Sequence, residues 1–167
     1  MLEIKLIVCP VDFSEFSIRP YHYALSLAEH YRANHLSRIL FCTDFSENSE
    51  RALNYAITTI AEYDAELTLL HVLEEVPSPT KTEGAITTAT EHLDKLIPQE
   101  ARKSLKIRRA VRMGKPYQQI IQFLAEAQID MVTMGVSGRG ALDRAVFGST
   151  TYRVMQLGSC PVLLVHV

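Results

Sequence analysis

Three glycines and two adjacent hydroxyl side chains form the part of this sequence best suited to binding chemistry. Gly135 and Gly138 are separated by two residues, and nine more residues precede the run Gly148-Ser149-Thr150. Because glycine carries no side chain beyond hydrogen, backbone N–H groups at such positions can approach an anion closely. The Gly-Ser-Thr run also opens a predicted helix, whose first N–H groups and positive dipole end favour negative charge. The pattern therefore predicts a loop that holds phosphate groups.

Apolar runs and helical periodicity alternate along the chain and place this loop after a buried strand. The predicted strands are Ile39–Thr43, Leu67–Leu73, Lys106–Val111, Ile129–Met134 and Val162–Val167, and the predicted helices are Glu47–Tyr63, Ala85–Ile97, Tyr117–Gln128 and Ser149–Leu157. Such alternation predicts a parallel sheet with helices on both faces. In these sheets ligands bind beyond the carboxyl ends of the strands, where the strand order reverses. We expect the glycine loop at that edge.

The predicted helices each have one apolar face for the core. The inward residues expected from the helical period are Leu53, Ala56, Ile57 and Ile60, then Ile86, Ala89, Leu93 and Leu96, then Ile120, Ile121 and Leu124. The segment 74–82 contains Pro77 and Pro79 and is predicted to be a loop. The strand at 106–111 mixes basic and apolar residues, which indicates a position close to a sheet edge.

The first strand-loop-helix unit is present twice. A shift of 32 residues superimposes Asp12-Phe13-Ser14-Glu15 on Asp44-Phe45-Ser46-Glu47, within eleven identities over the 27 positions 7–33. Residues 1–36 are therefore predicted to be a partial repeat, and residues 37–167 the main domain. The first copy has no glycine loop of its own, so we expect the chain to hold one ligand and not two.

Composition and charge narrow the class of protein. Hydrophobic residues make up 47% and charged residues 22% of the 167 positions, as in a folded soluble domain. The net charge of −2 gives no electrostatic reason to expect nucleic acid. No apolar run reaches the roughly 20 residues that cross a bilayer, and the N-terminus lacks the features of a signal peptide. Cys9, Cys42 and Cys160 are predicted to be reduced, buried thiols in a cytoplasmic protein.

Several of these motifs together resemble one family. The Thr43-Asp44-Phe45-Ser46 turn, the strand ending Leu70-His71-Val72, the Gly114-Lys115-Pro116 turn, the glycine pattern and the tail Ser159–Val165 are similar to those of the universal stress protein A family. The resemblance covers about residues 37–167. It implies an open five-stranded parallel sheet of strand order 3-2-1-4-5, Rossmann-like and of the adenine nucleotide alpha hydrolase-like type. It also implies a homodimer through the last strand, Val162–Val167.

The resemblance further implies an adenine nucleotide site, because members with this glycine pattern bind ATP. Asp44 and the backbone at Val72 would contact adenine, and Thr43 and Met134 would line the base and ribose pocket. Gly135 would lie near the ribose and α-phosphate. The residues that would hold the phosphates are Gly138, Arg139, Gly148, Ser149 and Thr150. The ligand would be ATP, or ADP or AMP, with Mg²⁺ or Mn²⁺ on the phosphates.

Other interpretations of these residues stay open. The glycines could serve tight turns and packing only, Ser149 and Thr150 could simply cap a helix, and Arg139 could be a solvated charge. The family often has proline before the Thr-Asp pair, where this chain has Cys42, while the first copy keeps Pro10. The adenine-side wall could therefore come from Asp44 or from Asp12.

Three classes of function fit the sequence. The first is a nucleotide-binding stress or signalling module that hydrolyses ATP slowly or not at all. The second is an ATPase that needs a partner, or a nucleotidyl-transfer enzyme, although those enzymes have a glycine-rich loop where this chain has Asp44-Phe45-Ser46-Glu47. The third is a dimerisation module without nucleotide. The apolar faces of the N-terminal repeat are expected to pack on, or exchange with, a partner subunit.

Overall fold

The computed structural model describes residue 26 and residues 36–74, 79–136 and 148–166. Most of the predicted N-terminal repeat, together with Gly138, Arg139 and Val167, lies outside the described residues. The described elements are, in chain order, β1 (Arg38–Thr43), α2 (Glu47–Tyr63), β2 (Glu66–Leu73), α3 (Pro79–Leu96), α4 (Gln99–Ser104), β3 (Lys106–Met113), α5 (Pro116–Glu126), β4 (Met131–Val136), α6 (Gly148–Leu157) and β5 (Val162–His166).

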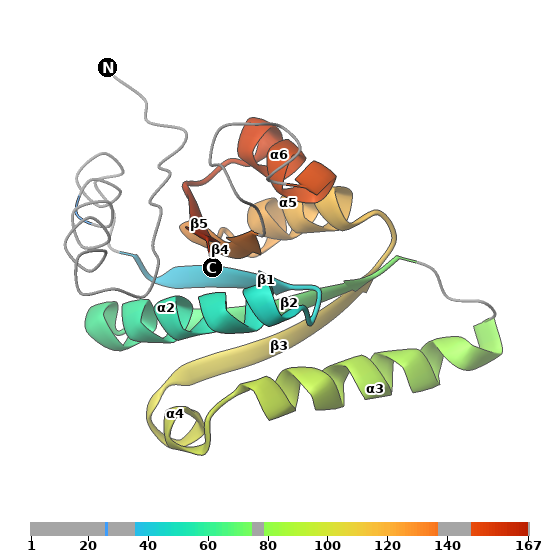
Figure 1. The fold of residues 1–167 in the computed structure, drawn as a ribbon, viewed down its shortest axis with the longest axis horizontal. Coiled ribbons are helices and arrows are strands. Elements are labelled where there is room, and N and C mark those ends of the chain that lie inside the picture. Colours follow the sequence, from blue (N-terminus) through green and yellow to red (C-terminus); the bar gives the residue numbers. More distant parts are fainter. Residues whose placement is uncertain (1–25, 27–35, 75–78, 137–147, 167) are drawn as a thin grey trace.

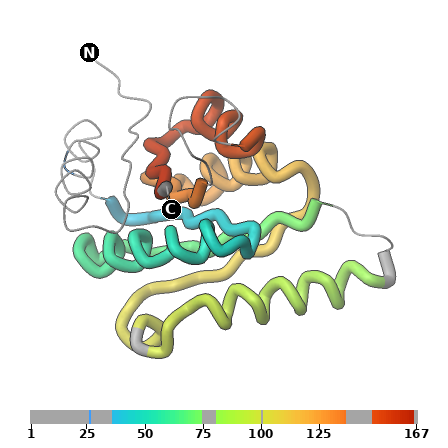
Figure 2. The backbone as a smooth tube through the Cα atoms, in the orientation of Figure 1, coloured from blue at the N-terminus to red at the C-terminus, as the bar shows by residue number. Residues whose placement is uncertain are grey.

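The strands form a five-stranded parallel sheet in the order β3-β2-β1-β4-β5, as predicted. Helices α2 and α3 cover one face, and α5 and α6 cover the other (Figures 1 and 2). The central strand β1 has Ile39, Leu40 and Phe41 fully buried, because its side chains meet helices on both faces. Successive side chains of β1 thus belong to two separate apolar cores, one on each side of the sheet.

Helix α2 has the bounds that the sequence predicted, and its ends explain why. Ser46 is the N-cap, and its hydroxyl accepts a hydrogen bond from the Ser49 N–H at 3.3 Å. Glu47 lies in the first turn, where a negative charge is favoured by the helix dipole. Asp64 closes the helix in a left-handed conformation with φ of 49°. Leu53, Ala56 and Ile60 are buried as expected, whereas Ile57 is only partly buried.

The prediction for the region after β2 is wrong in three respects. Helix α3 begins at Pro79, inside the segment predicted to be a loop, because proline is well tolerated in the first turn of a helix. Ile86, expected in the core, is 37% exposed, while Ala89 and Leu93 further along α3 are buried against the sheet. The short helix α4 was not predicted, since six residues are too few to show a clear helical period.

Strand β4 extends further than predicted. It continues through Gly135 to Val136, and Gly135 pairs with Val165 of β5. The first glycine of the binding pattern therefore lies inside the sheet and not in the loop that follows it. The expectation that the strand at 106 lies at an edge is confirmed, because β3 pairs with β2 and is the last strand of the described sheet.

Candidate functional site

A pocket of about 180 Å³ lies at the carboxyl ends of β1, β2 and β4, between the starts of α2, α5 and α6. The chain runs outward from β1 to β3 on one side and then returns to β4 on the other, so the strand order reverses between β1 and β4. The pocket is therefore at the place where sheets of this type bind ligands. Its lining residues are Cys42, Thr43, Asp44, Ser49, Leu70, Val72, Glu74, Pro116, Ile120, Met134, Gly135, Thr150 and Thr151.

The pocket brings together most of the described residues that the sequence analysis selected. Those that line it are Thr43, Asp44, Val72, Met134, Gly135 and Thr150. Gly148 and Ser149 belong to the first turn of α6, beside Thr150, but do not line the pocket themselves. Gly138, Arg139 and Asp12 lie outside the described residues, so the structure does not test the choice between Asp44 and Asp12, and Asp44 lines the described pocket.

Sequence reasoning missed Ser49 and Glu74. Ser49 comes from the first turn of α2, and Glu74 is the residue directly after β2. A signal for both was present, because Ser49 follows the N-cap by three residues and Glu74 lies two residues beyond Val72. The remaining unselected lining residues are mainly apolar and belong to elements that pack around the pocket.

A chain of hydroxyl groups connects the end of β1 to the start of α2. The Phe45 N–H donates to Thr43 Oγ1 at 2.9 Å, and Ser49 Oγ donates to the Ser46 carbonyl oxygen at 2.8 Å. Thr43 Oγ1 and Ser49 Oγ are 2.8 Å apart. Since the Ser49 proton is used on the carbonyl, Thr43 must donate to Ser49. The Thr43 hydroxyl therefore fixes the shape of the turn, and Thr43 offers the pocket mainly its backbone and methyl group.

Asp44 stands exposed at the edge of the pocket, in the middle of this turn. Its Oδ1 accepts a hydrogen bond from the Ser46 N–H at 3.0 Å. Partial burial acts to raise the pKa of Asp44, but hydrogen bonds from the side chain and the backbone N–H of Ser46 are the main causes that lower it, and the pKa is below its ordinary value. The side chain is thus a carboxylate at neutral pH, able to accept hydrogen bonds from a ligand's hydroxyl or amino groups.

Gly135 lies where β4 passes very close to the first turn of α2. A Cβ atom at this position would be 2.5 Å from the Asn48 carbonyl oxygen and 2.7 Å from Ser49 Cα. Both neighbours are backbone atoms, so they cannot turn aside. The packing interpretation of this glycine therefore has a geometric basis. The same close approach brings Ser49 and Gly135 together in the wall of the pocket.

The start of α6 supplies the opposite wall. Gly148 has φ of 68°, a left-handed conformation that favours glycine, although a Cβ there would meet no atom within 4 Å. Thr150 and Thr151 follow it into the pocket. Arg153 lies over the Tyr117 ring at 4.4 Å from its centroid, which connects α6 to α5. The first turn of α6, whose N–H groups have no acceptor within the helix itself, thus reaches the pocket at Thr150.

Cys42 and Cys160 are buried and form no disulfide, as predicted for these two, while Cys9 lies outside the described residues. Burial raises the pKa of the Cys42 thiol far above its ordinary value, and the neighbouring Cys160 adds to this effect. A thiol with a raised pKa is a poor nucleophile. Cys42 thus contributes a small apolar surface to the pocket.

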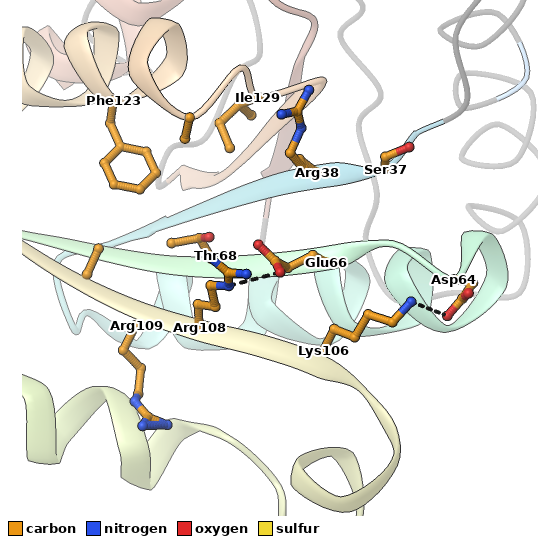
Figure 3. A pocket seen from close by; sticks show the side chains of 12 residues that line it. Ser37, Arg38, Asp64, Glu66, Thr68, Lys106, Arg108, Arg109, Phe123 and Ile129 are labelled. Atoms are coloured by element: carbon orange, nitrogen blue, oxygen red, sulfur yellow. Dashed lines mark hydrogen bonds and ion pairs between the residues drawn. The ribbon is translucent and has the colours of Figure 1, made fainter.

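A larger groove of about 700 Å³ lies at the amino ends of the strands, opposite the pocket (Figure 3). Two of its four cations pair with carboxylates that line it: Arg108 pairs with Glu66 at 2.9 Å, and Lys106 pairs with Asp64 at 3.2 Å. Arg109 points away from the groove toward α3, where it pairs with Asp94 at 3.0 Å. Arg38 donates to the side-chain oxygen of Gln128 at 3.1 Å. None of the described residues that the sequence analysis selected lines this groove, and since each of its cations already has a partner, the groove has no evident ligand.

A match to a known family covers the whole described domain. The sequence model named "Universal stress protein family" matches residues 35–166. The chain belongs to the universal stress protein family. Among curated relatives, universal stress protein MJ0531 of Methanocaldococcus jannaschii is 30% identical over 142 residues, which cover 79% of this chain and 83% of that protein. Universal stress protein YxiE of Bacillus subtilis is 28% identical over 121 residues, covering 63% of this chain and 82% of that protein.

Several solved structures share this fold. The hypothetical protein MJ0577 matches with a TM-score of 0.65 and 22% identity over 80% of this chain and 98% of its own. A universal stress protein in complex with cAMP matches with a TM-score of 0.60 and 21% identity over 80% and 98%. A family protein from Arabidopsis thaliana with AMP bound matches with a TM-score of 0.56 and 18% identity over 78% and 91%.

Two further observations concern only the part of the chain that the structure describes. No helix in that part has both the length and the apolar character required to cross a membrane. It also contains no group of three or more His, Cys, Asp or Glu side chains placed to hold a metal ion.

Proposed function

We propose that this chain is a stress-response or signalling module that binds one adenine nucleotide in the pocket at the carboxyl ends of β1, β2 and β4. The nucleotide is ATP, or ADP or AMP, and is hydrolysed slowly or not at all. The observation that carries the proposal is that Asp44, Val72, Gly135 and Thr150, which are far apart in the sequence, line one pocket where the strand order reverses.

The base and ribose bind between β1 and β2 in this proposal. Val72 lies near the end of β2, beyond the residues of that strand that pair with β1, and its backbone is proposed to supply the N–H and C=O groups for an adenine edge. Asp44 presents a carboxylate at the mouth of the pocket, and Met134 and Ile120 supply apolar surface for the faces of the base. Family members solved with cAMP and with AMP support an adenine ligand for this fold.

The phosphates extend toward the start of α6. Its first N–H groups and the Thr150 hydroxyl are suited to phosphate oxygens. Gly138 and Arg139 are proposed to complete this side of the site. Mg²⁺ or Mn²⁺ on the phosphates would neutralise part of their charge, and Asp44 and Glu74 are the carboxylates that line the described pocket.

Slow hydrolysis follows from the sequence. The chain has no Gly-x4-Gly-Lys-Ser/Thr motif of the kind that fast phosphoryl-transfer enzymes use. The pocket residues offer binding groups, but we identify no side chain among the described ones that is placed to orient an attacking water. In this proposal the site binds the nucleotide without hydrolysing it quickly, and the bound nucleotide acts as a signal.

A titration with a matched pair of variants tests this function. Asp44→Ala removes the carboxylate at the pocket, and we expect it to weaken ATP binding about tenfold, the effect of losing one charge-assisted hydrogen bond. Asp64→Ala removes an exposed carboxylate from the far end of α2, and ATP affinity should be unchanged. Calorimetric titrations with ATP, ADP and AMP in Mg²⁺ give the affinities.

Two outcomes would overturn the proposal. One is a wild-type protein that binds none of these nucleotides at millimolar concentration, which would favour a dimerisation module. The other is phosphate release at ordinary enzyme turnover by the wild type that Gly138→Val abolishes, which would favour an ATPase.

We also propose that the chain forms a homodimer in the cytoplasm through β5. This strand pairs with β4 and ends the described sheet on that side, so its outer backbone groups are available to a second copy. No membrane or nucleic-acid partner is proposed. The N-terminal repeat is proposed to strengthen the oligomer, and its test is given in the Discussion.

A further inference from the structure

Phe45 has a backbone conformation that its residue type disfavours. Its φ is 62°, in the left-handed region. Among the described residues other than glycine, only Asp64 and Gln128 share a positive φ, and both follow the end of a helix, where this conformation is common. Phe45 instead precedes the N-cap Ser46 and follows the pocket residue Asp44. Its conformation must therefore be maintained by contacts from outside the turn.

Two histidines from different elements hold the Phe45 ring. The ring centroid is 4.2 Å from that of His71 in β2, with the planes tilted by 32°. The His92 ring of α3 meets the same phenyl ring edge-on, at 5.4 Å and 86°. Phe45 also packs against the apolar core beneath α2. Offset and edge-to-face arrangements of this kind are favourable for aromatic rings.

His71 is itself attached to the pocket turn. Its Nδ1 lies 2.9 Å from the Thr43 carbonyl oxygen. Since a carbonyl oxygen can only accept, His71 carries a proton on Nδ1 and donates it there. The Phe45 N–H in turn donates a hydrogen bond to Thr43 Oγ1 at 2.9 Å. Thr43 and Phe45 therefore contact each other, and both contact His71. These three residues together enclose Asp44 in a ring of contacts.

We propose that Phe45 is a positioning residue for the base-side wall of the nucleotide pocket, an inference that rests on the proposed function. The ring, held by His71 and His92, keeps residue 45 left-handed. That conformation fixes the peptide between Thr43 and Phe45, so Asp44 and the Thr43 backbone face the pocket. Phe45 does not line the pocket, and it acts only through the two residues before it.

Through His92 these contacts extend to α3, an element that contributes no residue to the described pocket lining. His92 is exposed, so its contact with Phe45 is the side chain's visible role near this site. A displacement of α3 would therefore release one side of the Phe45 ring. The position of α3 thereby affects how tightly the adenine base binds.

The test compares adenosine with ATP, because Phe45 acts on the base side alone. Phe45→Ala removes the ring but keeps a Cβ atom, which disfavours the left-handed conformation. We expect it to weaken adenosine and ATP by the same factor, about tenfold. The ratio of the two dissociation constants, which reports the phosphate side, should stay within about twofold of the wild-type ratio. Phe45→Tyr keeps the ring and should restore both affinities.

His92→Ala is the second variant, because loss of an exposed side chain leaves the core intact even if Phe45→Ala fails to fold. It should weaken adenosine binding about threefold, and the matched variant Glu91→Ala, one position earlier on α3, should not. Unchanged adenosine affinity in both Phe45→Ala and His92→Ala would overturn the inference. A change in the ratio of the adenosine and ATP dissociation constants would also overturn it, because it indicates a generally loosened pocket. A wild-type protein that binds neither ligand would instead overturn the proposed function.

Discussion

At the residue scale, the two glycines at positions 135 and 148 satisfy different constraints. Gly148 needs glycine because its backbone is left-handed, with φ of 68°, although space for a side chain exists. Gly135 needs glycine because the α2 backbone is too close to admit a Cβ atom. Only the requirement at Gly148 is conformational, so the two positions should respond differently to larger residues. The sequence pattern alone treats them as equivalent.

Gly135→Ala should be strongly destabilising. Its Cβ would lie 2.5 Å from the Asn48 carbonyl oxygen, and overpacking against backbone costs about 1–3 kcal/mol. That corresponds to a loss of roughly 2–10 °C in Tm for a chain of this size. Gly84→Ala is the matched control, because Gly84 lies in α3 with no atom near a new Cβ, and alanine should stabilise that helix by about 0.5–1 kcal/mol. Equal thermal stability of the two variants would contradict the packing role.

The charge of Asp44 should stabilise the fold in a pH-dependent way. Its pKa is lowered in the folded state, so the carboxylate contributes stability that is complete above the unfolded pKa of about 3.9. The contribution is lost as the pH falls through the folded pKa. Asp44→Asn keeps an acceptor oxygen but cannot ionise. The difference in free energy of unfolding between wild type and Asp44→Asn, from urea titrations, should be constant between pH 8 and 5 and shrink below about pH 4. A difference that grows on acidification would show that the sign is wrong.

At the element scale, the junction between β1 and α2 organises the site. The hydroxyl chain through Thr43 and Ser49 fixes how the helix starts relative to the strand, and the close approach of Gly135 fixes its distance from β4. Two walls of the pocket therefore depend on the same turn of α2. Weakening this junction should affect both stability and binding.

Ser49→Ala tests this junction directly. Ser49 is buried, and its loss leaves the Thr43 hydroxyl proton without its acceptor, which costs about 1–3 kcal/mol. Thr58→Ala on the exposed part of the same helix removes only a bond to the Asn54 carbonyl and should change stability by less than about 0.5 kcal/mol. Chemical denaturation measures both. A double variant with Thr43→Val should lose clearly less than the sum of the single losses. Strict additivity would mean that the two hydroxyls do not interact.

The strands and the bounds of α2 could be predicted because buried parallel strands are continuous apolar runs and α2 has clear caps. The order of the strands was implied only by the family resemblance. Helix α3 was less predictable, since Pro77 and Pro79 indicate a loop although Pro79 opens the helix. The contributions of Ser49 and Glu74 to the pocket depend on how α2 is rotated and where the chain leaves β2. Those details come from packing between elements, which local sequence patterns do not encode.

At the scale of the whole molecule, residues 36–166 contain a complete five-stranded sheet with helices on both faces. The partial repeat at residues 1–36 is therefore additional to a family domain that needs no further strand. We propose that its likeness in sequence to the β1–α2 unit gives it apolar faces that require a partner surface. We expect that surface on another copy of the chain.

Deleting residues 1–35 should leave the domain folded and weaken the oligomer. The remaining chain should unfold in one cooperative transition, because both described cores are formed by residues after position 35. Sedimentation velocity over a range of protein concentrations measures the mass in solution. The truncated chain should dissociate at a higher concentration than the full chain. An unchanged concentration dependence would place the repeat outside the interface.

The central claim is that one adenine nucleotide binds at the carboxyl ends of the strands, and amide chemical shifts during an ATP titration test it most directly. At 18.8 kDa the chain is small enough for residue-by-residue assignment. The account predicts saturable shifts, fitting one site per chain, that are largest at the amides of Val72, Gly135 and Thr150. Lys106 and Arg108, in the groove at the other end of the sheet, should be unaffected. Shifts centred on that groove, or no shifts at millimolar ATP, would contradict the account.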